Sequence, residues 1–316
     1  MPKGRPSGAD IIGGEVRSLY AARRRPLRAR LLRRLSLLAL PLVLVLPFVL
    51  SACGAKSEPT GATVRLYPLA VRDADGRLVS LKTKPRSIAV AGGASAELAS
   101  ALGLPATRVG TGSGDLDLGL IRRLKPQLIL VGSGIAKVAV KQTQDLGIAV
   151  YVVPDQTLDG IEQALSDVSL LAGVPILGRT ERARLVAARD SVRRALVAVK
   201  PVRVFIDLGH FTTASNGSFI GSIISEAGGI DVAGPDAQEG PFPLKRLRRL
   251  RPEVLVTGTD SRLTIAKLRR NSATRWLPAV RSGRLVRVDI HLLEPGPAAA
   301  DGLRELATAL HPDAFS

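Results

Sequence analysis

Cysteine, histidine and aromatic residues are all scarce in this sequence of 316 residues. It has one cysteine, Cys53, and three histidines, and aromatic side chains make up 3% of the chain. A single thiol excludes an internal disulfide, and three histidines leave few combinations of ligands for a metal site. The shortage of aromatic residues argues against binding of nucleic acid through stacked bases, in spite of a net charge of +18.

The residues before Cys53 indicate an export signal. A block rich in arginine, residues 23–34, precedes an uncharged apolar run, residues 35–50. The run is too short to cross a hydrocarbon layer of about 30 Å comfortably, and small residues follow it, as at a cleavage site. The quartet LSAC at residues 50–53 resembles the lipobox of bacterial lipoproteins. We therefore expect a signal peptide over 1–52, a lipid on Cys53, a tether over 53–65 and a location on the outer face of the cell membrane; an uncleaved anchor is the alternative.

Positive charge is concentrated in the last third of the chain. Beyond the expected signal peptide the chain has 35 basic and 25 acidic residues, and the basic ones cluster at residues 245–251 and 262–287. We interpret these clusters as a solvated basic face near anionic lipid headgroups. A pocket for an anionic ligand is the alternative.

An internal similarity predicts two related lobes. Residues 122–132 read RRLKPQLILVG and residues 248–258 read RRLRPEVLVTG. Each segment joins a basic helix end to a proline and then to a short apolar run closed by glycine. A proline after a helix cannot continue it, and such an apolar run is typical of a strand that is buried on both faces.

Strand-like and helical patterns alternate through both halves, which predicts an α/β fold with parallel sheets. Between the halves, Leu185, Ala188, Val192, Leu196 and Val199 recur at helical spacing and predict one long amphipathic helix. We expect an N-terminal lobe over 66–175, a bridging helix over 176–200 and a C-terminal lobe over 201–316.

An ordered set of motifs resembles the solute-binding proteins of ABC transporters, in the subgroup that captures cobalamin, ferric siderophores and haem. The resemblance implies two Rossmann-like lobes bridged by a single long helix, the class III periplasmic-binding-protein architecture, and a ligand held in the cleft between them. It spans nearly all of residues 66–312. The motifs are VRDADGRLVSLKTKPRSIAVAGGASAELASALGL (71–104), IRRLKPQLILV (121–131), SFIGSIISEAGGIDVA (218–233), LKRLRRLRPEVLV (244–256), WLPAVRSGRLVRVD (276–289) and EPGPAAADGLRELATALHP (294–312).

The resemblance also implies where a ligand binds, namely on loops that follow the carboxyl ends of strands. Histidine is the side chain that could add an axial ligand to a metal chelate, and polar loop residues would surround it. Phe211 and Phe242 are the aromatic residues expected to reach the cleft, whereas Trp276 is expected to pack beneath the last strand. The candidate ligand-binding residues are Ser133, His210, Phe211, Thr212, Ser215, Asp260 and His291.

Family members carry one glutamate on each lobe that pairs with arginines of the permease. Glu97 occupies the first position, but Lys245 occupies the second, and Glu239 is a possible substitute. The residue after Gly296-Pro297 is Ala298, where many relatives have an arginine, so a bidentate grip on carboxylates is missing here. The expected docking residue is therefore Glu97, with Glu239 as the alternative to Lys245 on the second lobe.

The resulting hypothesis is an exported, lipid-anchored solute-binding protein that delivers a metal chelate to an ABC permease and its ATPase. We expect a monomer without cofactor and without catalytic residues, since no nucleophile motif with a matching base is present. Two alternatives stay open: a scaffold lipoprotein that has lost its ligand, and a zinc- or manganese-binding protein that uses His210 and His291 with an acidic residue.

Overall fold

The computed structural model describes residues 66–111 and 114–316. These described residues belong to one compact unit. The expected signal peptide, the tether and Cys53 lie outside the described residues, so export and lipidation stay predictions. In the described part of the chain, no helix combines the length and the apolar composition that crossing a membrane requires.

The first sheet has four parallel strands in the order β4-β3-β5-β6. Strands β3 and β5 are apolar and buried at every position, as expected for strands covered on both faces. A short antiparallel pair, β1-β2, precedes this sheet and was not predicted. The strands are β1 (Leu69–Arg72), β2 (Leu78–Leu81), β3 (Ile88–Ala91), β4 (Ala106–Arg108), β5 (Leu128–Val131) and β6 (Ala149–Val152).

Helices cover both faces of the first sheet. Leu98 on α2 and Ile161 on α5 belong to one core cluster, whereas Ile121 on α3 and Val140 on α4 belong to another. Two helices therefore pack on each face of the sheet, in the arrangement predicted from the alternation. The helices are α2 (Gly93–Ala101), α3 (Leu118–Leu124), α4 (Lys137–Gln144) and α5 (Leu158–Leu171).

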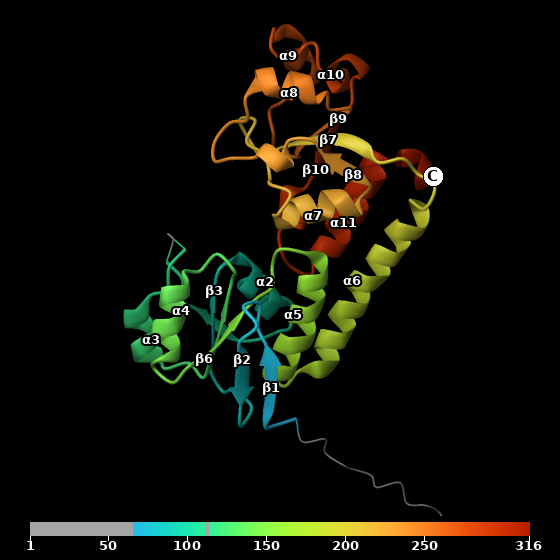
Figure 1. The fold of residues 1–316 in the computed structure, drawn as a ribbon. Helices are drawn as coiled ribbons and strands as arrows, with labels where there is room; N and C mark the ends of the chain where they lie inside the picture. Colours follow the sequence, from blue (N-terminus) through green and yellow to red (C-terminus); the bar gives the residue numbers. More distant parts are fainter. Residues whose placement is uncertain (1–65, 112–113) are drawn as a thin grey trace, which may run out of the picture. The chain divides into compact units, whose positions relative to one another are not determined.

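The second sheet repeats this architecture with the parallel order β10-β9-β7-β8. Helices α7 and α11 contribute to the large core on one face, and α8, α9 and α10 contribute to a separate core around Phe205 on the other (Figure 1). The predicted α/β class with two parallel sheets is confirmed. The elements are β7 (Val202–Asp207), α7 (Phe219–Glu226), β8 (Gly229–Asp231), η1 (Gly234–Asp236), α8 (Leu244–Leu250), β9 (Val254–Gly258), α9 (Ile265–Arg270), α10 (Pro278–Ser282), β10 (Leu285–Val288), η2 (Ile290–Leu293), α11 (Ala299–Leu310) and η3 (Pro312–Ala314).

Helix α6 (Pro175–Ala195) connects the two halves of the chain. It buries Leu185, Ala188 and Val192, as its sequence pattern predicts, and packs against α5 and α11. It ends at Ala195, five residues before the predicted end at Lys200. Pro201 keeps Lys200 out of the helix, because a residue before a proline is disfavoured in the helical conformation. Residues 196–198 form a turn between the helix and this proline.

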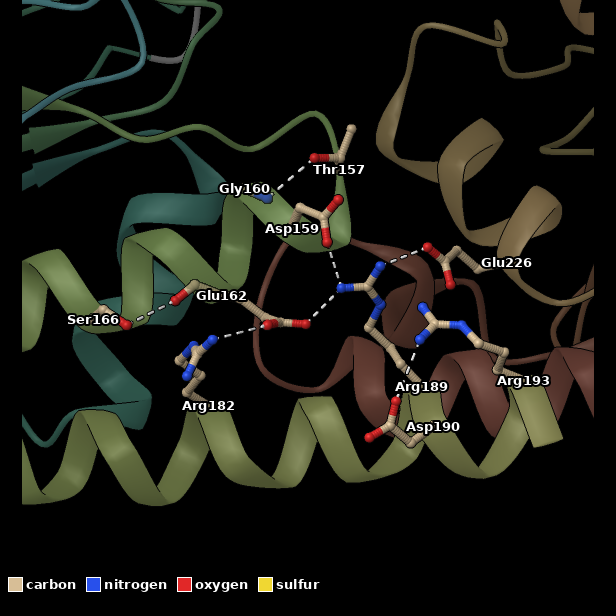
Figure 2. Close-up of polar contacts among 10 residues, drawn as sticks. All are labelled: Thr157, Asp159, Gly160, Glu162, Ser166, Arg182, Arg189, Asp190, Arg193 and Glu226. Atoms are coloured by element: carbon tan, nitrogen blue, oxygen red, sulfur yellow. Dashed lines mark hydrogen bonds and ion pairs between the residues drawn. The ribbon is translucent and has the colours of Figure 1, made fainter.

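A buried arginine on α6 ties this helix to its neighbours on both sides (Figure 2). Arg189 Nη1 lies 2.5 Å from Asp159 Oδ1 and 2.6 Å from Glu162 Oε1, both on α5. Its Nη2 lies 2.7 Å from Glu226 Oε1 on α7. Burial alone would lower the pKa of Arg189, but the hydrogen bonds to Glu226, Glu162 and Asp159 outweigh it and raise the pKa. The arginine therefore stays charged and links the first half of the chain to the second.

The two similar segments of the sequence adopt the same local structure. Helix α3 is capped by Lys125, with φ of 45°, and α8 is capped by Arg251, with φ of 49°. Both residues are left-handed, and in each copy a proline follows and leads into a buried strand, β5 or β9. The internal similarity predicted from the sequence thus corresponds to a repeated helix–turn–strand unit.

Candidate functional site

A cavity of about 890 Å³ lies at the carboxyl ends of β7, β9 and β10. In parallel α/β sheets this edge is where ligands normally bind. Four of the predicted ligand-binding residues line the cavity together: His210, Phe211, Asp260 and His291. Three separate loops, those that follow the three strands, contribute them.

The loop after β7 has an unusual backbone that Asp207 holds in place. Gly209, His210 and Phe211 all have positive φ, at 115°, 52° and 62°. Such conformations cost about 1–3 kcal/mol each for residues with side chains, and they cluster at functional sites. The buried carboxylate of Asp207 accepts hydrogen bonds from the backbone N–H groups of Gly209, at 3.0 Å, and Phe211, at 2.7 Å. Asp207 thereby fixes the loop that presents His210 to the cavity.

The aromatic residues near this loop lie mainly in the core. The rings of Phe211 and Phe242 pack on Phe205, with centroids 6.4 Å and 5.9 Å apart. Phe242 is only 5% exposed, so the expectation that it reaches the cleft is wrong. Its ring fills the apolar core between the second sheet and α8, where burial is more favourable than contact with solvent. Phe211 is half-buried, and among the described residues it is the one phenylalanine, tyrosine or tryptophan on the cavity wall.

Trp276 also differs from its predicted position. It was expected beneath the last strand, but its side chain is 50% exposed. The guanidinium carbon of Arg275 lies 4.9 Å from the ring centroid, and that of Arg248 lies 6.0 Å from it. Cation–π contacts of this kind stabilise an indole at the surface, which removes the need to bury it.

His291 is exposed at the rim of the cavity and paired with an acidic neighbour. Its Nδ1 lies 3.0 Å from Glu294 Oε1, and its backbone N–H donates to Asp289 Oδ1 at 3.0 Å. The hydrogen bond with Glu294 raises the pKa of His291, and the negative charges of Glu294, Asp289 and Asp260 add to this effect. The imidazole is therefore protonated over a wider pH range than an isolated histidine.

Basic and hydroxyl side chains complete the cavity, and the sequence analysis did not select them. Arg262 and Lys267 line it, as does Thr257, whose buried Oγ1 has no hydrogen-bond partner among the described residues. The guanidinium of Arg287 donates to the carbonyl oxygens of Ser261, at 2.8 Å, and Leu263, at 2.5 Å, and so shapes the loop after β9. The sequence shows Arg262, Lys267 and Arg287 as part of a run of basic residues. Such a run alone does not distinguish residues of a cavity wall from residues of a solvated face.

The other predicted residues lie outside the lining of this cavity. The backbone of Thr212 closes the loop after β7 by hydrogen bonds with Leu208 and Gly209, and the carbonyl of Ser215 accepts from Ser218 Oγ at the start of α7. Ser133 follows β5 in the first sheet, where its hydroxyl donates to Asp155 Oδ1 at 2.5 Å. Glu97 is exposed on α2 next to Gly296, where an added Cβ would come within 3.0 Å of the Glu97 Cβ.

No metal centre is assembled in the part of the chain that the structure describes. His210 and His291 line the same cavity, but no group of three or more histidine, cysteine, aspartate or glutamate residues is placed to hold a metal ion there. Zinc sites need three or four such ligands. The alternative of a bare zinc or manganese site thus has no arranged ligand set among these residues.

Two curated relatives are similar to this chain in sequence, although no family model matches it. A cobalamin-binding protein of Halobacterium salinarum is 27% identical over 202 residues, which cover 60% of this chain and 54% of that protein. The alignment therefore spans about half the length of that relative. The uncharacterized ABC transporter substrate-binding lipoprotein YvrC of Bacillus subtilis is 22% identical over 311 residues, covering 86% of this chain and 96% of that protein.

A solved structure agrees with these relatives. The periplasmic vitamin B12 binding protein BtuF of Vibrio cholerae superposes with a TM-score of 0.62 at 21% identity, covering 73% of this chain and 98% of that one. None of the three names describes an enzyme, in agreement with the expectation of a binding protein. The chain is therefore similar, in sequence and in fold, to the substrate-binding proteins of ABC transporters, and the resemblance inferred from its motifs is confirmed.

Proposed function

We propose that this chain is an extracytoplasmic solute-binding protein of an ABC importer that captures a metal chelate, namely a ferric siderophore, cobalamin or haem. The observation that carries the proposal is the cavity at the carboxyl ends of β7, β9 and β10, which brings His210 and His291 together beside Phe211 and Asp260. The names of the cobalamin- and vitamin B12-binding relatives support this class of ligand.

The chemistry of the cavity suits a large ligand that carries both polar groups and a metal. Its two histidines can donate an imidazole nitrogen to a metal with a free axial position. Arg262 and Lys267 can pair with acidic groups of the ligand, and Asp260 can accept hydrogen bonds from its amides or hydroxyls. The strained backbone at His210 is a further reason to assign the site here. Of the described side chains that line this cavity, Phe211 alone offers a phenyl ring for stacking, so the cavity favours a ligand that is held mainly by polar contacts.

Attachment and delivery form the second half of the proposal. A lipid on Cys53 would hold the protein at the outer face of the membrane, beside a permease and its ATPase. Glu97 is an exposed acidic side chain available for docking, whereas Lys245 would repel permease arginines at the corresponding place on α8. Ser133, which follows β5 in the first sheet, would contribute to the cleft from the N-terminal lobe, and Thr212 and Ser215 would do so from the C-terminal lobe.

A thermal-shift panel on the full chain tests the ligand class directly. Cobalamin, haem, several ferric siderophores, and zinc and manganese salts are each added in excess. A specific ligand present at about 100 times its Kd adds about 2.7 kcal/mol to the free energy of unfolding. A shift with one chelate identifies the ligand, and no shift with any compound supports the scaffold alternative. A shift with zinc or manganese alone supports the bare-metal alternative.

Three histidine variants then locate the site. His210→Ala and His291→Ala should weaken the affinity for the identified chelate. His311→Ala is the matched control, because the ring of His311 contacts the carbonyl of Gly228, at 3.1 Å, outside this cavity. The control should retain the affinity of the original chain. Equal affinities in all three variants would contradict the assignment of the site.

A further inference from the structure

The excess positive charge of the chain beyond residue 52 lies in one segment. Residues 244–284 contain twelve lysines and arginines but only two acidic residues. The rest of residues 53–316 contains twenty-three basic and twenty-three acidic residues, so its net charge is zero. Evenly dispersed charge would not give this separation. The separation indicates a surface that attracts a negatively charged partner.

The fold places the three helices of this segment on one side of the second sheet. Helices α8, α9 and α10 lie together on the side of β7 and β9 away from α7 and α11 (Figure 1). Contacts connect them: the Arg248 guanidinium on α8 lies over the Trp276 ring, and Arg269 Nε on α9 donates to the carbonyl of Val280 on α10. We call the exposed residues of this region the basic surface, defined by Arg248, Arg249, Arg269, Arg270, Arg275 and Trp276.

Two acidic side chains near the basic surface have other partners. Asp236 pairs with Arg246 at 2.5 Å, and Glu253 accepts a hydrogen bond from the backbone N–H of Arg203. Within the described residues, Arg249 and Arg270 have no acidic partner. Arg249 and Arg270 therefore present unpaired positive charge at the surface, where it can attract a negatively charged partner.

An exposed tryptophan within this surface limits the class of partner that would fit it. Trp276 is the single tryptophan of the chain, and half of its side chain is exposed. Indole has an apolar body and a polar N–H group, and for this reason tryptophan is enriched at membrane–water interfaces. Basic residues near an anionic leaflet each contribute about 1 kcal/mol of attraction. Arginine and an exposed indole together match a lipid headgroup layer.

We propose that the basic surface docks the folded part of the protein onto anionic lipid headgroups, with Trp276 inserted at the level of the headgroups. A membrane fits this surface, because five of its six defining residues are arginines and an anionic leaflet presents negative charge over a wide area. This surface would make a second contact with the membrane, in addition to the predicted lipid on Cys53. The contact would not depend on the bound ligand.

Trp276 provides the measurement, because all tryptophan emission of the chain comes from it. The full chain is reconstituted into vesicles of phosphatidylcholine alone or of phosphatidylcholine with phosphatidylglycerol. In the anionic vesicles we expect a blue shift of the emission and quenching by brominated lipid, and neither in the neutral ones. Salt at about 1 M, where the Debye length is about 3 Å, should reverse both effects.

Two double variants test whether the position of the charges matters or only the net charge of the protein. Arg249→Gln/Arg270→Gln removes two charges that do not contact the indole. It should lower the equilibrium constant for binding of the surface to anionic lipid about fivefold per charge. Arg122→Gln/Arg123→Gln is the control, because it removes the same number of charges from exposed arginines on α3, outside the basic surface. The control should behave as the original chain does. Identical emission in both kinds of vesicle would overturn the proposal, as would equal losses in the two double variants.

Discussion

His291 shows how local charge adjusts a single side chain at the rim of the cavity. Its hydrogen bond with Glu294, and the nearby carboxylates of Asp289 and Asp260, raise its pKa. A raised pKa means that the folded state binds the proton more tightly than the unfolded chain. The stabilisation from the pair is thus fully present below the ordinary pKa of about 6.5, and it is lost as the pH rises through the folded pKa.

Removing the charge of Glu294 tests its pair with His291. Glu294→Gln should lower the pKa of His291, because the variant loses both the negative charge and the charge-assisted hydrogen bond. An NMR titration of the imidazole resonances measures the change, with Glu253→Gln as a remote control that leaves the pKa unaltered. An unchanged His291 titration in Glu294→Gln would show that the pair does not form in solution.

A ligand that coordinates a metal through His291 should bind more weakly as the pH falls, because the proton competes with the metal for the same nitrogen.

The repeated helix ends of α3 and α8 illustrate how a short element is terminated by backbone conformation. Lys125 and Arg251 occupy the left-handed position at which glycine is usual. Their N–H groups bond to the carbonyls of Ile121, at 2.8 Å, and Leu247, at 3.2 Å. A residue with a Cβ pays about 1 kcal/mol for this conformation. The sequence repeat therefore preserves a strained cap in both halves of the chain.

Glycine at these two caps should relieve the strain. We expect Lys125→Gly and Arg251→Gly each to raise the free energy of unfolding by up to about 1 kcal/mol. Arg122→Gly, inside α3, should instead lower it by about 1 kcal/mol, because glycine is unfavourable within a helix. Urea unfolding of the three variants tests this. A loss at Lys125 or Arg251 equal to that at Arg122 would contradict the left-handed caps.

Across the whole molecule, Arg189 connects elements that belong to different halves of the chain (Figure 2). Its side chain is 10% exposed, and two of its partners, Glu162 and Glu226, are 12% and 29% exposed. Asp159, in contrast, is 81% exposed and contributes little beyond a screened contact. A second ion pair, Arg184 with Asp301, links α6 to α11. These contacts hold α6 against α5 in the first half of the chain and against α7 and α11 in the second half.

Removing the charge of Arg189 should therefore be costly. Arg189→Met leaves Glu226 without its cation and Glu162 with only Arg182, at 3.6 Å. We expect a loss of about 3 kcal/mol in the free energy of unfolding. Arg193→Met is the matched control on the same helix: Arg193 is 64% exposed and pairs with Asp190 at 3.4 Å, so its loss should stay below about 1 kcal/mol. Urea denaturation measures both. Similar losses for the two variants would show that Arg189 is no stronger a link than a surface pair.

Individual residues explain how far prediction from the sequence could go. The buried strands β5 and β9 were visible as short apolar runs after a proline, because burial on both faces selects for such runs. Strand pair β1-β2 was missed, since four-residue strands that alternate in burial carry a weak pattern. Phe242 and Trp276 were misplaced because both are aromatic residues in loops, and sequence alone does not tell whether a core or an arginine covers the ring.

The sequence by itself determined the alternation of strands and helices, the internal repeat and the concentration of positive charge after residue 244. These are properties of neighbours along the chain, which propensity and hydrophobic period express locally. Only the tertiary structure decided that His210 and His291, 81 residues apart, line one cavity, and that Arg189 reaches carboxylates on two other helices. Such contacts depend on the order of strands in a sheet and on the packing of helices over it, which no local pattern encodes.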